Sequence, residues 1–167
     1  VRVVDTRKVS IGANLVARKL IKLVETGCSL DEVFESVPRV IDNTFMEFSV
    51  PTLKYLIKNG RIGKAQGLAG TLLNIKPILS VDEEGFISPI AKLRGMKKLQ
   101  EQMVQNIVEF LQNRRKSITL YSIYGSEEYL TVMHETTEWL IESIESRLGI
   151  SRSDIELVSG RIWPTIA

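Results

Sequence analysis

Cysteine and histidine are almost absent from the 167 residues, which contain one of each, Cys28 and His134. A single cysteine excludes a disulfide within the chain, and one cysteine with one histidine cannot complete a structural zinc site. We therefore expect no metal and no cofactor. Because thiols stay reduced in the cytoplasm, we expect the protein to belong to that compartment.

Long apolar runs are absent as well. No stretch reaches the length of about 18 apolar residues that crosses a bilayer, and the first residues do not have the pattern of a signal peptide. An excess of basic charge is also missing, because 22 Lys and Arg residues are balanced by 20 Asp and Glu residues. We expect a soluble chain that does not insert stably into membranes and does not bind nucleic acid.

The remaining composition is that of a globular protein. Apolar residues make up 44% and charged residues 25% of the sequence, enough for one ordinary hydrophobic core. We therefore expect the chain, 1–167, to form one domain, with at most a small part of another.

Five stretches have the apolar spacing or end signals of helices. The first follows Ser10 and ends at Gly27, and the second begins with a capping box formed by Ser29 and Glu32. Pro38 is expected to kink or end that second helix, because proline lacks a backbone donor. The other three helices are expected at 51–60, 96–113 and 127–148, the fourth with a stripe of Met96, Leu99, Met103, Ile107, Phe110 and Leu111.

Strands are predicted between these helices, at 1–4, 45–50, 75–81, 86–92, 117–124 and 154–158. The third and fourth strands are joined by Asp82-Glu83-Glu84-Gly85, which is typical of a hairpin turn. The order of elements indicates an α/β (α+β) fold in which a mixed, largely antiparallel sheet is covered by helices.

Glycine is concentrated at positions 60, 63, 67 and 70. The last three would share one face of a helix, where another backbone or a ligand could approach closely. The spacing does not match the phosphate-binding glycine motifs. Arg61 lies among these glycines and among apolar residues, and on residue type alone it fits a structural ion pair as well as an anion-binding group.

Other polar groups favour structural roles, so we predict no catalytic residue. His134 lies in a predicted helix without a nucleophile at a suitable spacing, and a solvent-facing position is expected. The acidic hairpin turn lacks the alternating oxygen ligands of a calcium loop. The basic run Arg114-Arg115-Lys116 follows a helix, where cations complement the exposed carbonyl groups.

The run LKYLIKNGRIGKAQGLAGTLLNIKPIL, from Leu53 to Leu79, resembles the signature of the DegV family. Flanking segments agree in order, with VVDTRKVSIGANLV near the start and Gly85, Pro89 and 92–95 in the following hairpin. The resemblance covers nearly the whole chain and is strongest between residues 45 and 98. It implies the carboxy-terminal, lipid-tunnel domain of a bacterial two-domain protein, with residues 1–28 as candidates for packing against the amino-terminal domain.

The family resemblance implies a carrier rather than an enzyme. Such proteins hold one long-chain fatty acid in an apolar tunnel and present it to a separate fatty acid kinase subunit. Arg61 matches the arginine beside the carboxylate, and Lys92 and Arg94 match a turn implied in contact with the kinase. The resemblance implies apolar tunnel walls formed by Phe45, Phe48, Leu53, Leu56, Ile62, Leu72, Ile75 and Ile78.

Two features of the family pattern have no counterpart. The amino-terminal domain, which supplies Ser and Thr hydroxyls to the carboxylate, is missing before Val1, and a Thr-His segment followed by Gly-Pro-Gly is missing near Ala167. We therefore expect Arg61 to form only part of a carboxylate site. The alternatives are a structural or interaction domain without lipid, and a phosphoryl-transfer enzyme, although neither a phosphate loop nor a metal-binding carboxylate cluster is visible.

Overall fold

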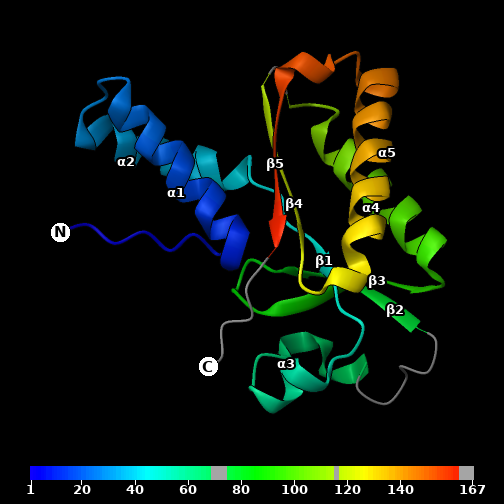
Figure 1. Ribbon diagram of the computed structural model, residues 1–167. Helices are drawn as coiled ribbons and strands as arrows, with labels where there is room; N and C mark the ends of the chain where they lie inside the picture. The colour runs from blue at the N-terminus through cyan, green and yellow to red at the C-terminus, as the bar shows by residue number, and fades with distance from the viewer. Residues whose placement is uncertain (69–74, 115–116, 162–167) are drawn as a thin grey trace. The chain divides into compact units, whose positions relative to one another are not determined.

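The structure is a computed structural model that describes residues 1–68, 75–114 and 117–161. The chain divides into two compact units, Val1–Leu99 and Gln100–Ala167, each with a small sheet of its own (Figure 1). The predicted α/β class with helices and antiparallel strands is confirmed. No helix within the described ranges is long and apolar enough to cross a bilayer.

The first unit begins with two helices that lie side by side, α1 (Ser10–Glu25) and α2 (Leu30–Asp42) (Figure 1). Gly27, with φ +92°, reverses the chain after α1, and its N–H donates to the carbonyl of Val24 at 2.9 Å. The N–H of Cys28 donates to the carbonyl of Leu23 at 3.1 Å. These two bonds form the Schellman arrangement, so the predicted end of the first helix is confirmed.

The capping box at the start of α2 is confirmed too. The Glu32 side chain accepts from the N–H of Ser29 at 2.7 Å, and the Ser29 hydroxyl accepts from the N–H of Glu32 at 3.3 Å. Pro38, expected to kink or end this helix, does not end it, because α2 continues to Asp42. Burial of Val37 and Val40, on either side of the proline, offsets the one lost backbone bond.

The predicted strand at 1–4 is wrong, because residues 1–9 are neither helix nor strand. A strand needs a neighbour for its backbone N–H and C=O groups, and none of the described strands pairs with this segment. The segment instead contacts α2: the Arg2 guanidinium lies 2.6 Å from a carboxylate oxygen of Asp31 and 4.9 Å from the ring centre of Phe34.

The sheet of the first unit has the order β1-β2-β3 and is antiparallel throughout, formed by β1 (Phe48–Ser49), β2 (Ile75–Val81) and β3 (Ile87–Arg94). The predicted hairpin is confirmed, with Gly85 at φ +84° in its turn. Strand β1 is shorter than the predicted 45–50. Because β2 is central and both Ile78 and Leu79 are 0% exposed, this strand is buried on both faces.

Two short helices connect β1 to β2, the α-helix α3 (Lys54–Lys58) and the 3₁₀ helix η1 (Gly63–Leu68). The predicted glycine face falls on η1 only in part, because Gly63 has φ +53° and Gly70 lies outside the described residues. Helix α4 (Met96–Leu111) then follows β3 and continues into the second unit.

The second unit contains a parallel strand pair, β4 (Ile118–Tyr124) and β5 (Ile155–Arg161). Between them lie the 3₁₀ helix η2 (Glu127–Tyr129), α5 (Leu130–Leu148) and the 3₁₀ helix η3 (Arg152–Asp154). Parallel strands require such a crossover, and α5 provides it (Figure 1). The expected strands therefore divide between two sheets, and this second sheet is parallel where one largely antiparallel sheet was expected.

The core of the second unit lies between α4 and α5, where Val104 and Val108 contact Leu140 and Ile144. In this unit the buried face of α4 differs from the predicted stripe: Val104 and Val108, which the stripe did not include, are buried, whereas Met103, Ile107 and Phe110 are half-buried. His134 is exposed on α5, as predicted.

We predict that Ser29→Ala lowers the free energy of unfolding by about 1 kcal/mol, because the N–H of Glu32 loses its acceptor and the capping box is broken. Chemical denaturation of the intact protein measures this loss. Ser36→Ala in the same helix is the matched control, because the Ser36 hydroxyl only donates to the carbonyl of Val33. Equal destabilisation by both substitutions would contradict the role of the cap.

Candidate functional site

An apolar cluster fills the space between the sheet of the first unit and the segment that contains α3 and η1. Leu53, Ala65, Leu68 and Leu79 are its buried members. Its partly buried members, Phe48, Val50, Leu56, Ile62 and Ile87, come from both outer strands, α3 and the loops around it. We call these nine residues the Leu53 cluster. The cluster joins β1, β2 and β3 to the two short helices.

Arg61 is placed at the edge of this cluster by the end of α3. Gly60, with φ +65°, donates its N–H to the carbonyl of Ile57 at 3.0 Å. The N–H of Arg61 donates to the carbonyl of Leu56 at 2.8 Å, which completes a second Schellman arrangement. The next residue, Ile62, packs against the Leu53 cluster. The backbone of Arg61 is therefore fixed between a helix end and the apolar cluster.

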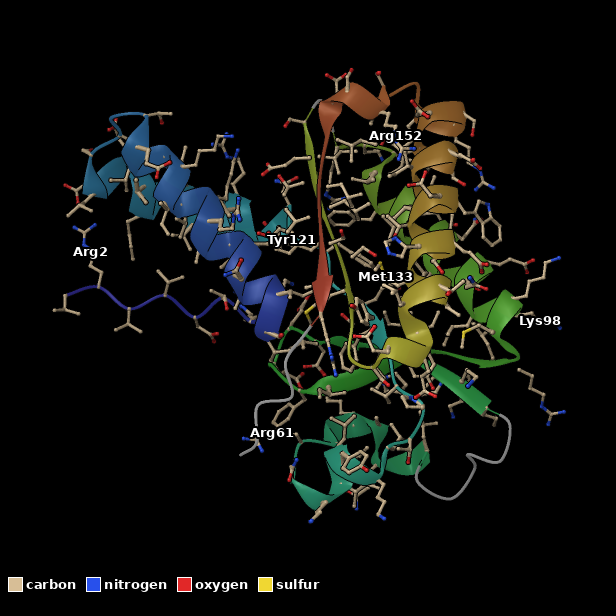
Figure 2. The ribbon with its side chains drawn as sticks, viewed as in Figure 1. Arg2, Arg61, Lys98, Tyr121, Met133 and Arg152 are labelled. Atoms are coloured by element: carbon tan, nitrogen blue, oxygen red, sulfur yellow. The ribbon has the colours of Figure 1, made fainter. Side chains whose placement is uncertain are left out.

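The side chain of Arg61 is exposed and lies at the surface beside α3 (Figure 2). Its Nη1 donates to the carbonyl oxygen of Asn59 at 3.2 Å. Ion pairs between described residues do not include Arg61. A guanidinium has five N–H donors, so most of its capacity faces solvent at this site. The exposed position disfavours a buried structural ion pair among the described residues.

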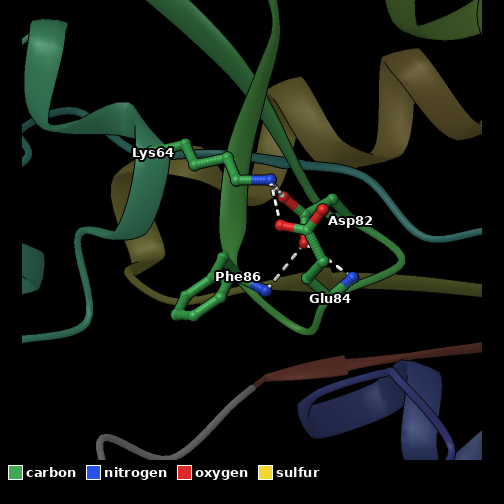
Figure 3. Close-up of polar contacts among 4 residues, drawn as sticks. All are labelled: Lys64, Asp82, Glu84 and Phe86. Carbon is green, nitrogen blue, oxygen red and sulfur yellow. Dashed lines mark hydrogen bonds and ion pairs between the residues drawn. The ribbon is translucent and has the colours of Figure 1, made fainter.

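Helix η1 is held against the hairpin by its first two residues. A Cβ atom at Gly63 would lie 2.5 Å from the carbonyl oxygen and 2.8 Å from the nitrogen of Ile87, so only glycine allows this approach to β3. The Lys64 ammonium lies 2.8 Å from Oδ2 of Asp82 and also pairs with Glu84 (Figure 3). These contacts place η1 over the turn that joins β2 to β3.

The ion pair shifts both titrating groups in the direction that favours charge. The hydrogen bond to Asp82 is the main cause that raises the pKa of Lys64, and the bond from Lys64 is the main cause that lowers the pKa of Asp82. The stability that Asp82 contributes is thus present above its unfolded pKa and lost as pH falls through the lowered value. That of Lys64 is present below its unfolded pKa and lost as pH rises through the raised value.

Four of the eight predicted tunnel residues meet in the Leu53 cluster: Phe48, Leu53, Leu56 and Ile62. Ile78 is fully buried, but it lies on the face of β2 opposite to that of its neighbour Leu79, which belongs to the cluster. Ile75 and Phe45 are half-buried outside the cluster, and Leu72 lies outside the described residues.

The sequence prediction missed five members of the cluster, Val50, Ala65, Leu68, Leu79 and Ile87. The alternation of side chains in β2 could have identified Leu79, because Leu79 and Ile75 share one face of the strand. The burial of Ala65 and Leu68 depends on the 3₁₀ conformation of η1. Local sequence does not predict that conformation.

The predicted partner-binding residues, Lys92 and Arg94, are both exposed. They are two positions apart on β3, opposite Pro77 and Ile75 of β2, so they share one face of the sheet. Their positive charges are therefore presented together at the end of the hairpin.

Two of the polar groups singled out in the sequence have partners within the described part of the chain. Within the described ranges, no group of three His, Cys, Asp or Glu side chains is arranged to hold a metal. The acidic hairpin turn is paired with Lys64. Arg114 donates from Nη1 to the carbonyl of Phe110 at 2.8 Å, as expected for a cation at the end of a helix.

Comparison with known proteins places the chain in a family. The model of the DegV family, described as "Uncharacterised protein, DegV family", matches residues 1–160. The chain belongs to the DegV family. A DegV domain-containing protein of Clostridium acetobutylicum is 30% identical over 158 residues, which are 93% of this chain and 54% of that protein. One from Lactococcus lactis is 35% identical over 128 residues, 77% of this chain and 44% of that protein.

Solved structures of DegV proteins have the same fold. A fatty-acid-binding DegV family protein of Thermus thermophilus superposes with a TM-score of 0.75 at 31% identity, over 95% of this chain and 53% of that one. A DegV family protein of Ruminococcus gnavus, solved with vaccenic acid, superposes with a TM-score of 0.70 at 27% identity. The match covers 95% of this chain and 53% of that one. The chain thus spans about half the length of the proteins it matches.

We predict that Gly63→Ala lowers the free energy of unfolding by about 1–3 kcal/mol because alanine is strained at the positive φ of this position. The clash of its Cβ with the backbone of Ile87 adds to this loss. Gly67→Ala in the same 3₁₀ helix is the matched control, because a Cβ there meets no atom within 4 Å. The control should change the free energy by less than about 0.5 kcal/mol. Equal values for both in thermal or chemical denaturation would show that the close approach does not matter.

Proposed function

We propose that this chain forms one part of a site for a single long-chain fatty acid. The Leu53 cluster and the residues around it contact the acyl chain, and Arg61 lies beside the carboxylate. The observation that carries the proposal is an exposed arginine whose backbone N–H is bonded to Leu56 of that apolar cluster, in a chain 31% identical to a fatty-acid-binding DegV protein. Because the chain spans about half of its relatives, the remaining carboxylate contacts belong to the rest of such a protein.

The two parts of the site contribute differently to binding. Burial of the methylenes of a sixteen-carbon chain gives roughly 11 kcal/mol before ordering costs, at about 0.8 kcal/mol each. A charge-assisted hydrogen bond from Arg61 contributes about 1.5–3 kcal/mol. The acyl chain therefore supplies most of the affinity. Arg61 orients the head group and selects a carboxylate over an alcohol.

In this proposal the protein is a carrier and not an enzyme. It presents the acid to a separate fatty acid kinase in the cytoplasm, and the kinase contributes the phosphoryl-transfer chemistry. Lys92 and Arg94 are the proposed contacts with the kinase, because their exposed charges share one face at the end of the hairpin. A structural or interaction domain without lipid is the competing function, and it requires that no acid binds beside Arg61.

Native mass spectrometry of the intact protein after bacterial expression tests the proposal. We expect a co-purifying mass of a few hundred daltons that matches a fatty acid, because a buried acyl chain dissociates slowly. Delipidated protein should then be stabilised against heat by added palmitic acid, since a ligand that binds only the folded state raises its stability. No co-purifying mass together with no thermal shift would leave the structural domain as the better assignment.

Arg61→Ala in the intact protein should weaken the binding of palmitic acid about 10- to 100-fold and leave the binding of hexadecanol nearly unchanged. Only the acid carries the charge that Arg61 contacts. Titration of delipidated protein with both ligands measures the difference. Lys58→Ala is the control, since Lys58 is another exposed cation, at the end of α3. Equal losses for acid and alcohol would show that Arg61 is structural.

A further inference from the structure

Lys64 joins two segments that are distant in the sequence. Its ammonium lies 2.8 Å from Oδ2 of Asp82, pairs with Glu84, and lies 6.0 Å from the ring centre of Phe86 (Figure 3). Lys64 is in η1, and its three partners are in the turn between β2 and β3. The contact is therefore tertiary and fixes η1 to the hairpin.

The turn is a pre-ordered partner for Lys64. Oδ1 of Asp82 accepts from the N–H of Glu84 at 3.1 Å and from the N–H of Phe86 at 2.9 Å. The N–H of Gly85 donates to the carbonyl of Asp82 at 3.0 Å. Because one carboxylate oxygen and the backbone already hold the turn, the other oxygen is available to Lys64 without rearrangement.

Only two residues separate Lys64 from Arg61. One of them, Ile62, packs in the Leu53 cluster and accepts the N–H of Ala65 at 3.1 Å. The other, Gly63, lies against the backbone of Ile87. Because this connection is short, the anchor on the hairpin also limits how far the backbone of Arg61 can move relative to the sheet.

Lys64 and Arg61 are the two cations of the 60–68 segment, and they have different surroundings. Lys64 is neutralised by two carboxylates, whereas Arg61 has a backbone carbonyl as its described side-chain partner. We propose that Lys64 is a positioning residue: its ion pair with Asp82 and Glu84 holds Arg61 beside the Leu53 cluster, so that the guanidinium meets the ligand carboxylate. This inference rests on the proposed function.

The test uses Lys64→Gln, Lys64→Arg and Asp82→Asn in the intact, delipidated protein, titrated with palmitic acid and with hexadecanol. Asparagine keeps the Oδ1 acceptor of the turn, so the hairpin is preserved, but it replaces the Oδ2 acceptor that faces Lys64 with an uncharged amide donor. We expect Lys64→Gln and Asp82→Asn each to weaken the binding of the acid about three- to fivefold, which is the upper range for the loss of an exposed ion pair. The binding of the alcohol should not change. Lys64→Arg should restore most of the affinity.

The double variant Lys64→Gln with Asp82→Asn should lose little more affinity for palmitic acid than Lys64→Gln alone, because the two residues act through one contact. A gain in acid affinity with Asp82→Asn would instead make Lys64 a direct ligand and overturn its positioning role. Equal losses of affinity for acid and alcohol would show that Lys64 stabilises the fold in general, and would overturn its positioning role. Unchanged acid binding in Lys64→Gln would also overturn the inference and leave the proposed function intact.

Hydrogen exchange tests the anchor without any lipid. The amides of Arg61 and Ala65 should exchange faster in Lys64→Gln, while the amide of Asn43, bonded to the carbonyl of Arg39 at 3.1 Å, should not change. Unchanged exchange at Arg61 would overturn the inference. If the wild-type protein bound neither palmitic acid nor hexadecanol, the proposed function would fail and the inference with it, whatever the exchange result.

Discussion

Burial of β2 on both faces is the constraint on which the first unit depends. Ile78 and Leu79 are adjacent, point to opposite faces and are both fully buried, so each face of the central strand must be covered. The Leu53 cluster covers the Leu79 face, and it can do so only if α3 and η1 lie over the sheet. The placement of Arg61 is thus a consequence of the way in which this strand is buried.

Close backbone approach and charge act together at the junction of η1 with the hairpin. Gly63 allows the backbone to reach Ile87, and the adjacent Lys64 binds the turn that follows β2. The packing of Ala65 and Leu68 of η1 in the Leu53 cluster is non-directional and supplies the larger energy, whereas the ion pair is weaker and directional. A glycine and a lysine at adjacent positions therefore set both how close η1 lies and which way it faces.

The elements that could be predicted from sequence are those with local chemical signals. Ser29 with Glu32 determines the start of α2, Gly27 the end of α1, and Asp82 with Gly85 the hairpin turn. The predictions that were wrong concern features that depend on residues distant in the sequence. Residues 1–4 have the composition of a strand but no described strand beside them, Pro38 is tolerated because its neighbours are buried, and the parallel pairing of β4 with β5 is tertiary. In the site, the position of Arg61 followed from its glycine, but the burial of Ala65 and Leu68 required the conformation of η1.

The length of α3 has a consequence for the lifetime of the site. A helix of five residues is far below the roughly 12–15 that an isolated helix needs in water, so α3 persists only while the sheet supports it. Whenever the hairpin opens, the turn that presents Arg61 is lost as well. A ligand that binds the folded state beside Arg61 would therefore also stabilise the hairpin against local unfolding.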